Sequence, residues 1–125
     1  MIPIFVHQAL AGRPLRVFST GQQRREHMHV GDIVRGLQLG AGPGRPERRG
    51  AQLPRQRDGL DTRDCEFITD RLGGTVEHMP GRPGEVLGLM LDSSRAAALG
   101  FTPRNPFWHG LADYIEFEKV IAGVS

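Results

Sequence analysis

The chain has 125 residues, of which 38% are hydrophobic and 24% charged, so it is long enough for one ordinary globular domain and unlike a disordered or fibrous chain. Its apolar runs fall far short of the ~20 residues that cross a bilayer, which excludes a membrane-spanning helix. No basic residue precedes the apolar N-terminal run, and Cys65 is the single cysteine. We therefore expect no signal peptide and a cytoplasmic location.

The net charge of +2 is concentrated in one segment. Residues 41–65 hold six arginines and four acids, and the rest of the chain is balanced. This segment has no aromatic side chain for base stacking, and its acids are interleaved with its arginines. Nucleic-acid binding is therefore not expected, although an anionic polymer stays an alternative ligand for this segment.

In chain order, apolar residues at helical spacing predict a helix over 2–11, which Gly12 and Pro14 end. The alternating sequence LRVF predicts a strand over 15–18, and Ser-Thr-Gly over 19–21 predicts a turn.

A second alternating stretch, REHMHV over 25–30, predicts a return strand with His27 and His29 on one face. Asp32 is then expected to cap a helix whose buried side carries three apolar residues, Ile33, Val34 and Leu37.

Residues 41–65 have almost no apolar residue and no period, which is typical of a flexible loop. A loop of this length inside a compact domain is expected only where it is functional or disordered. A local frameshift between about Leu39 and Cys65 is a second interpretation. A GC-rich back-translation of residues 50–66, read one base later, permits a segment that contains an Asn followed by Gly-Ser-Gly.

The C-terminal part predicts further short elements. FITDRL from Phe67 reads as a helix ended by two glycines at 73–74, and 75–79 reads as a strand. Asp92 is expected to cap the helix SSRAAAL. Asn105 is expected to cap a last helix from Pro106 to about Ile121. Its predicted apolar face consists of Trp108, Leu111, Ala112, Ile115 and Val120.

No catalytic centre emerges from the residues. Tyr114 and Lys119 are the only residues of their types, and a spacing of five makes them diverge around a helix. The glycines at 40, 42 and 44 follow no predicted strand and open no helix, so they do not form a phosphate-binding loop. Metal ligation would have to combine residues without ligand spacing, and no metal site is expected. These residues are His7, His27, His29, His78 and Cys65.

Two arginines are candidate ligand contacts. Arg25 follows the predicted turn, and Arg82 lies between two prolines with Glu85 three residues on. A guanidinium offers a two-pronged donor to phosphate oxygens, and a carboxylate can accept from a ribose hydroxyl. From the residues alone, solvated surface arginines are the simpler interpretation.

Three stretches resemble the C-terminal part of the NAD-dependent nucleotide-sugar epimerase/dehydratase family, the extended short-chain dehydrogenases. Residues 2–37 are similar to the family's strand–turn–strand–helix with its Gly-x-Gln-x-Arg core. Residues 72–86 are similar to its Arg-Pro-Gly-Glu/Asp loop, and residues 91–117 to its closing helices. The three stretches follow the family's order and approximate spacing.

The resemblance implies a set of substrate contacts. Arg25 and Arg82 would bind the diphosphate of a UDP- or dTDP-sugar, and Glu85 a ribose hydroxyl. The strand at Val17 and Phe18 would lie against the base, and Gln23 belongs to the same core motif. His27 stands where the family usually has an aromatic residue, Glu26 where it has Asp, and Gly31 where it has the first Asp of a pair.

The resemblance also implies the fold class, an α+β, helix-rich C-terminal substrate-binding portion of a Rossmann-type enzyme. The chain from 1 to 125 would form a single partial domain. The family's NAD-binding turn and catalytic Tyr-x-x-x-Lys do not occur in this sequence. We therefore expect no catalytic residue and no NAD binding by this chain alone. Expected partners are a nucleotide sugar, and a separate NAD-binding chain or a second copy. The alternative is a non-enzymatic interaction protein that uses the Arg-rich segment or an exposed apolar face.

Overall fold

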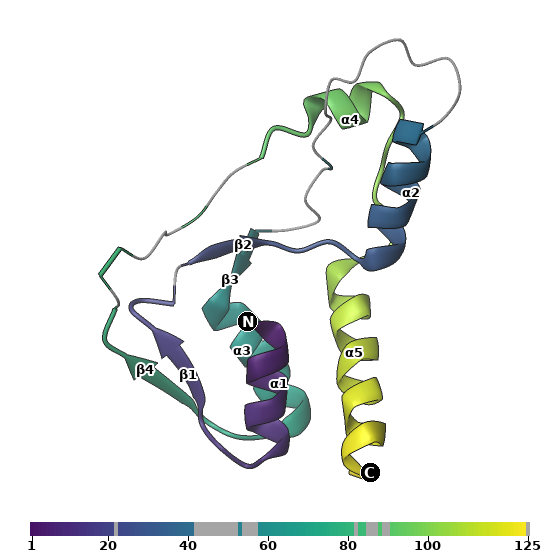
Figure 1. Cartoon of the computed structure of the whole chain (residues 1–125). Helices are drawn as coiled ribbons and strands as arrows, with labels where there is room; N and C mark the ends of the chain where they lie inside the picture. Colours follow the sequence, from purple (N-terminus) through teal and green to yellow (C-terminus); the bar gives the residue numbers. More distant parts are fainter. Residues whose placement is uncertain are drawn as a thin grey trace. The chain divides into compact units, whose positions relative to one another are not determined.

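The computed structural model describes residues 1–21, 23–41, 53, 58–81, 83–84, 88 and 91–124. Its elements are, in chain order (Figure 1), α1 (Ile2–Leu10), β1 (Leu15–Phe18), β2 (Arg24–Glu26), α2 (Val30–Ala41), β3 (Asp58–Leu60), α3 (Asp61–Leu72), β4 (Val76–Met79), α4 (Ser94–Ala98) and α5 (Phe107–Ala122). The chain divides into two compact units. The first comprises 1–25, 59–89 and 111–125, and the second comprises 26–58 and 90–110.

The first unit is built around a parallel pair of strands. β1 pairs with β4 in the register Leu15↔Val76 to Phe18↔Met79. α1 and α3 pack against each other, and both contact β1, as Figure 1 shows. The buried apolar side chains of this unit are Phe5, Val6, Ala9, Leu15, Val17, Cys65, Ile68, Leu111 and Ile115. Burial of these side chains is the main force that holds the unit together.

The second unit contains α2, α4 and the segment that follows α4. Its buried apolar side chains in the described part of the chain are Ala96 and Phe101. The Arg35 guanidinium lies 5.5 Å from the centre of the Phe101 ring, which is cation–π distance. The Asp32 carboxylate is fully buried in the same unit. Polar contacts therefore contribute a larger share of the packing here than in the first unit.

Most of the predicted elements are present. The structure confirms the helix at 2–10, the strand at 15–18, the strand near 76–79 and the helix that ends before Gly73. Asp92 Oδ1 accepts a hydrogen bond of 2.9 Å from the Ser94 N–H, but the N-cap of α4 is Ser93, so Asp92 lies one position before the cap that it was predicted to form.

The return strand was predicted wrongly. The strand after the turn is only β2, which pairs with β3, and α2 already begins at Val30. β1 pairs in parallel with the distant β4 and not with β2. His27 and His29 therefore lie outside any strand. Alternation in REHMHV was misleading because residues 29–33 form the first turn of a helix, in which the Asp32 and Ile33 N–H groups donate to the His29 carbonyl.

The helix expected from Phe67 begins six residues earlier, at Asp61, and β3 precedes it. Residues 58–65 are therefore regular structure. Asp61 and Asp64 are acids in the first turn of α3, where the helix dipole favours negative charge. A helix start that is almost free of apolar residues has no hydrophobic period to reveal it. The rest of the predicted loop, apart from Ala41 and Leu53, lies outside the described residues.

Two predicted apolar faces differ from the structure. Ile33, Val34 and Leu37 of α2 are exposed instead of buried. On α5, Leu111 and Ile115 are buried as expected, but Val120 is 79% exposed. Pro106 lies one position before the helix, and its carbonyl accepts the N–H groups of His109 and Gly110. Within the described residues, no helix is long and apolar enough to cross a membrane.

Candidate functional site

The carboxyl ends of β1 and β4 lie side by side in the first unit. The pairing continues past both strands, since the Ser19 N–H donates to the Met79 carbonyl at 2.9 Å. A Cβ atom added at Gly81 would lie 3.2 Å from the Ser19 Cβ, so the segments after the two strands touch. Ligands of open α/β folds bind outside the carboxyl ends of parallel strands. This edge is therefore the candidate site.

The turn after β1 is held in an unusual backbone conformation. Ser19 has a φ of 56°, which is rare for a residue other than glycine, and Gly21 has a φ of 69°. The Gly21 carbonyl accepts hydrogen bonds from the Thr62 hydroxyl at 3.0 Å and the Thr62 N–H at 3.3 Å. The start of α3 thus fixes the turn, and the turn directs the chain away from β1 instead of back along it.

Gln23 stabilises the segment that follows the turn. Its side chain is almost fully buried, and Nε2 donates to the Phe18 carbonyl at 2.8 Å. The bond ties Gln23 to the last residue of β1. Its Oε1 is buried and accepts no hydrogen bond in the described part of the chain. Sequence reasoning placed Gln23 in a core motif, and the structure gives it a positioning role.

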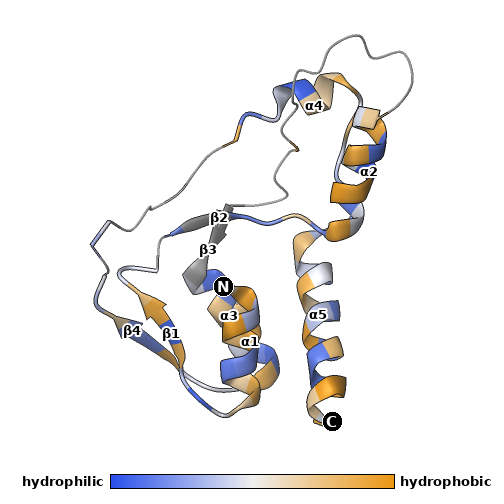
Figure 2. Ribbon diagram, in the orientation of Figure 1, coloured by the Kyte–Doolittle hydropathy of each residue, from blue (hydrophilic) through white to orange (hydrophobic). Residues whose placement is uncertain are grey.

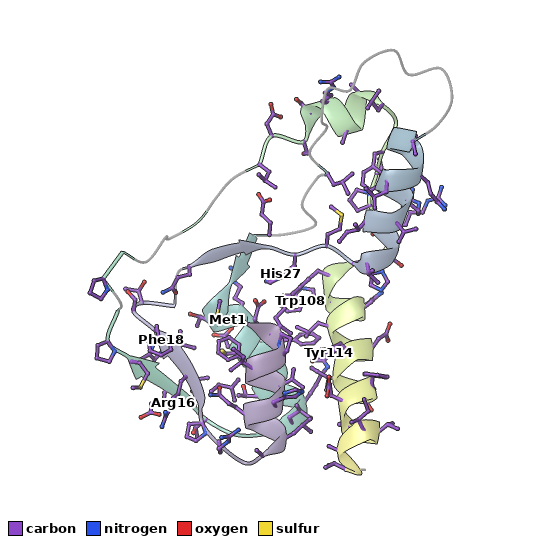
Figure 3. All side chains as sticks on the ribbon, viewed as in Figure 1. Met1, Arg16, Phe18, His27, Trp108 and Tyr114 are labelled. Atoms are coloured by element: carbon purple, nitrogen blue, oxygen red, sulfur yellow. The ribbon has the colours of Figure 1, made fainter. Side chains whose placement is uncertain are left out.

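The structure separates the two predicted base contacts. The Val17 side chain is 1% exposed and belongs to the core of the unit, because residues 15 and 17 face inward. Phe18 is half-buried and points to the opposite face of the strand, as does Arg16 (Figure 3). A base beside β1 would therefore contact Phe18 and the main chain, whereas the Val17 side chain packs into the core on the other face of the strand.

The predicted charged contacts are described only in part. Arg25 lies on β2, directly after Gln23 and Arg24. Arg82 and Glu85 lie outside the described residues, although Gly81, Pro83 and Gly84 on either side of Arg82 are described. The chain leaves β4 at the candidate edge, and Gly81 lies against Ser19. The prediction for these three side chains stays a prediction.

Another charged pair marks the exposed side of the same strands. Arg16 Nε lies 3.2 Å from Glu77 Oε2, and both side chains are about half exposed. An exposed ion pair of this kind stabilises a fold by less than about 1 kcal/mol. Arg16 is thus a surface arginine of β1, which makes it a useful control for the candidate ligand contacts.

Asp32 was predicted to cap a helix, but it is the third residue of α2, which begins at Val30. Its carboxylate accepts the backbone N–H groups of Arg104 and Asn105, each at 3.0 Å, and Arg35 Nη1 at 2.7 Å. Burial raises the pKa of Asp32, but these hydrogen bonds and one from the Asn105 side chain outweigh it and lower the pKa overall. No pattern in the sequence links positions 32 and 104.

Tyr114 and Lys119 are in separate pairs on α5. Burial, together with a hydrogen bond to Glu118, raises the pKa of Tyr114 to about 12. Glu118 also contacts His7 Nε2 at 3.1 Å, whereas Lys119 Nζ lies 3.2 Å from Glu116. The two residues diverge, as their spacing predicts. A phenol with this pKa is protonated at neutral pH.

Neither a metal centre nor a dinucleotide cradle is formed by the described residues. They contain no group of three or more His, Cys, Asp or Glu side chains arranged to hold a metal ion. A dinucleotide needs a strand, a glycine-rich turn and a helix N-terminus in succession. Here β1 leads through its turn into β2, and β4 leads into the segment at 80–84. Among the described residues, neither strand end therefore leads into a dinucleotide cradle.

Comparison with known proteins agrees with the fold. Residues 1–41 match the model of the NAD dependent epimerase/dehydratase family. The chain is 29% identical over 126 residues to a dTDP-glucose 4,6-dehydratase of Streptomyces niveus, and 30% identical over 124 residues to a UDP-glucose 4-epimerase of Mycolicibacterium smegmatis. The chain is therefore similar to members of the NAD-dependent epimerase/dehydratase family.

The structural match with members of this family covers nearly the whole chain. A dTDP-glucose 4,6-dehydratase of Streptomyces venezuelae, crystallised with NAD and DAU bound, superposes with a TM-score of 0.87 at 27% identity, over 98% of this chain. A UDP-glucose 4-epimerase of Thermotoga maritima superposes with a TM-score of 0.83 at 22% identity, which shows the same fold. The predicted fold class, a helix-rich α+β portion of an extended short-chain dehydrogenase, is confirmed.

The chain matches only part of each relative. It spans 36% of the Streptomyces niveus dehydratase, 38% of the Mycolicibacterium smegmatis epimerase and 39% of the Streptomyces venezuelae structure. The fold therefore corresponds to a portion of these enzymes.

Proposed function

We propose that this chain is the nucleotide-sugar-binding part of an epimerase or dehydratase and has no catalytic activity by itself. The observation that supports the proposal is the parallel pairing of β1 with β4, which ends with Ser19 against Met79 and Gly81. It brings the turn before Arg25 and the segment before and after Arg82 to one edge. These residues are 57 positions apart in the sequence (82 − 25).

The roles of the residues follow from their chemistry. Arg25 and Arg82 bind the two phosphates, since each guanidinium forms paired hydrogen bonds to phosphate oxygens. Glu85 accepts a hydrogen bond from a ribose hydroxyl, and Phe18 packs against the base. Gln23 and Val17 position this edge from the inside, through the bond from Gln23 to the Phe18 carbonyl and the burial of Val17.

NAD enters this proposal only through the relatives, several of which have it bound in their structures. This sequence has neither the glycine-rich turn nor the Tyr-x-x-x-Lys pair, and its strand ends do not lead into a dinucleotide cradle. A hydride acceptor and a general base would have to come from another polypeptide. The chain alone, in a cytoplasmic setting, would bind its nucleotide sugar without converting it.

Isothermal titration tests the binding role. We expect the full chain to bind UDP-glucose or dTDP-glucose, and Arg25→Ala and Arg82→Ala each to weaken binding by about tenfold or more, because each removes a charge-assisted contact. Arg16→Ala is the matched control. It removes an exposed arginine from β1, the strand that leads to the candidate edge, and we expect binding to be unchanged.

An absence of binding to either sugar would contradict the proposal, provided that circular dichroism shows a folded chain. Equal losses in the Arg16 and Arg25 variants would also contradict it, because they would indicate general attraction between an anion and a basic protein. Turnover of a nucleotide sugar by the chain alone would overturn the inactive part of the proposal.

The alternative function is that of a non-enzymatic interaction protein. The exposed apolar residues of α2 and α5 favour this candidate, because exposed apolar patches commonly mark protein contacts. A second version of this alternative is that the Arg-rich segment binds an anionic polymer. It predicts salt-sensitive heparin binding that is lost on deletion of 45–57. Nucleotide-sugar binding without heparin binding would exclude this second version.

The origin of the Arg-rich segment is tested on the DNA. Under the frameshift hypothesis, resequencing would restore a Gly- and Ser-rich reading between about Leu39 and Cys65. An uninterrupted frame whose codons are incompatible with the shifted reading would end the hypothesis. The upstream DNA would encode a glycine-rich βαβ unit and a Tyr-x-x-x-Lys if the chain is part of a complete family member.

A further inference from the structure

The turn after β1 contains a strained residue. Among the residues that the structure describes, Ser19 is the one non-glycine residue with a φ in the left-handed region, at 56°. A side chain is unfavourable at this φ because its Cβ atom crowds a carbonyl oxygen, and serine is not among the residues that tolerate it best. Such strain persists only where the surrounding structure imposes it, and it clusters at functional sites.

Hydrogen bonds at both ends of the turn impose this conformation. The Ser19 N–H donates to the Met79 carbonyl at 2.9 Å, and the Gly21 carbonyl accepts from the Thr62 hydroxyl and N–H. Figure 2 shows the turn near the middle of the hydropathy scale, so burial of apolar side chains does not explain its shape. None of these bonds uses the Ser19 side chain. A glycine at position 19 would therefore keep them all and relieve the strain.

The Ser19 side chain contacts the segment that follows β4. A Cβ atom added at Gly81 would lie 3.2 Å from Ser19 Cβ and 3.3 Å from Ser19 Oγ. The serine side chain therefore occupies the space that a side chain at position 81 would need. Gly81 precedes Arg82, a proposed phosphate contact, and Ser19 follows Phe18, the proposed base contact. The contact thus joins the two sides of the candidate site.

We propose that Ser19 is a positioning residue of the candidate site, whose side chain sets the spacing between the segments that follow β1 and β4. The strained backbone is what places a Cβ atom against Gly81. A ligand that spans both segments then finds them already at binding distance, so less conformational freedom is lost on binding. This inference rests on the proposed nucleotide-sugar binding, and it assigns Ser19 a role through Gly81 and not through direct contact with the ligand.

Titration calorimetry of the full chain with UDP-glucose and dTDP-glucose tests this role. Ser19→Gly removes the contact with Gly81, and we expect its dissociation constant to rise about fivefold or more. Ser19→Ala keeps the Cβ atom and removes only the hydroxyl, so it should bind about threefold or more tighter than Ser19→Gly. Thr20→Gly is the matched control. It adds the same backbone freedom at the next position of the turn, and its binding should match that of the parent chain.

Urea unfolding of the same variants separates positioning from stability. Ser19→Gly should be more stable than Ser19→Ala, because alanine retains the left-handed strain and glycine does not. The variant that binds more weakly would then be the more stable one. A residue that only stabilises the fold would give the same order for stability and for affinity, so opposite orders identify the positioning role.

A disulfide tests the spacing without any ligand. The Cβ positions of residues 19 and 81 are 3.2 Å apart, close to the separation of about 3.5–4.5 Å in disulfides. We expect Ser19→Cys/Gly81→Cys to form this bond under mild oxidation, and the oxidised chain to bind nucleotide sugar at least as tightly as the reduced one. Arg16→Cys/Gly81→Cys should stay reduced, because Arg16 lies opposite Glu77, four positions before Gly81 (81 − 77). Cys65 is buried and common to both variants.

The outcomes distinguish this proposal from the proposed function. No binding of either sugar by the folded parent chain would overturn both. Binding by the parent chain that Ser19→Gly leaves unchanged would overturn the positioning role alone. Equal losses in Ser19→Gly and Thr20→Gly would do the same, because they would mean that flexibility of the turn, and not the contact with Gly81, weakens binding.

Three further results would overturn the positioning role. Equal losses in Ser19→Gly and Ser19→Ala would assign the effect to the hydroxyl. Failure of Ser19→Cys/Gly81→Cys to form the disulfide would mean that the two segments are not adjacent in solution. A loss of binding on oxidation of that variant, reversed by reduction, would mean that the segments must separate to admit the ligand. Circular dichroism confirms that each variant is folded before any of these results is interpreted.

Discussion

Asp32 shows how one buried carboxylate can organise a small unit. It joins α2 to residues 104 and 105, which are more than seventy positions away in the sequence. The net lowering of its pKa means that the charged form is favoured in the folded state. The carboxylate therefore stabilises the fold above its unfolded pKa of about 3.9, and this stabilisation is lost as the pH falls below that value through the folded pKa.

We expect Asp32→Asn to lower the free energy of unfolding by about 2–3 kcal/mol at neutral pH, because the amide loses the charge that the N–H groups and Arg35 face. Urea unfolding measures the loss. The same variant should show a weaker fall in stability between pH 5 and pH 2 than the parent chain. Asp113→Asn, an exposed acid on α5, is the control. Equal losses in both variants would contradict the special role of Asp32.

Tyr114 can be followed directly because it is the only tyrosine. A spectroscopic pH titration should give a midpoint near 12, raised from 10 by burial and by the bond to Glu118. Glu118→Gln should move this midpoint back towards 10, because the repulsion between a phenolate and a carboxylate disappears. Glu116→Gln, which removes the partner of Lys119, should leave it unchanged. A parent midpoint at 10 would refute the assignment.

The candidate site was predictable at the level of residue type and order, but not of orientation. The motif around Gln23 and Arg25 pointed to the segment that follows β1, because the turn glycine is a local signal, and the ligand contacts of this segment stay a prediction. That Val17 faces the core while Phe18 faces outward depends on which side α1 and α3 cover, and that is a tertiary property. The contact between Ser19 and Gly81 depends on the pairing of strands more than fifty residues apart.

At the scale of elements, the turn between β1 and β2 is the most constrained connection. Gly21 has a positive φ, and a Cβ atom there would collide with the Thr62 side chain and lie 3.0 Å from Val17 Cγ1. Gly12, after α1, has nearly the same φ of 65° and nothing within 4 Å. Substitutions at these two glycines can therefore separate the free-energy cost of a left-handed backbone conformation from the cost of steric overlap.

We expect Gly12→Ala to destabilise the chain by about 1 kcal/mol, which is the cost of a left-handed conformation for alanine. Gly21→Ala should cost about 2–3 kcal/mol, because overlap with Thr62 and Val17 is added to the same conformational term. Urea unfolding of both variants gives the two values. Equal costs would mean that the packing of Thr62 against the turn contributes nothing.

The elements that sequence reasoning missed share a cause. The structure has α3 beginning at Asp61 and the apolar residues of α2 facing the solvent. In both places polar contacts, and not hydrophobic burial, determine the local structure. Hydrophobic periodicity correctly identified α2 as amphipathic, but it assumed that the apolar side faces inward. Asp32 reverses that orientation, because its hydrogen bonds with Arg35, Arg104 and Asn105 lie on the other side of the helix.

At the scale of the molecule, the two units differ in how much apolar surface they bury. Among the described residues, the first unit contains most of the buried apolar side chains, and the second contributes Ala96 and Phe101. Regions with few buried apolar contacts open at lower free energy. In dilute solution, hydrogen exchange should therefore be faster for the amides of α2 than for those of α1 and α3. Equal protection of the three helices would contradict this expectation.

The overall fold could be predicted from the sequence because three separate stretches resemble one family in the right order. The structural matches confirm that fold over nearly the whole chain, although the chain spans about two fifths of the Streptomyces venezuelae structure. The division into two units could not be predicted in the same way. It depends on contacts between distant segments, such as 32 with 104, for which a single sequence contains no signal.

The pairing of β1 with β4 also has a consequence for the order in which the chain assembles. Leu15 and Val76 are in register across a closed loop of 61 positions (76 − 15). During synthesis, β1 emerges early and stays an open strand edge until β4 has been made, and such edges are prone to aggregate. Both sides of the candidate site follow these two strands, so under the proposed function the chain would bind a nucleotide sugar only after this pairing. Ligand added during refolding would then bind only after β1 and β4 have paired, and it would not change the rate of the earlier folding steps.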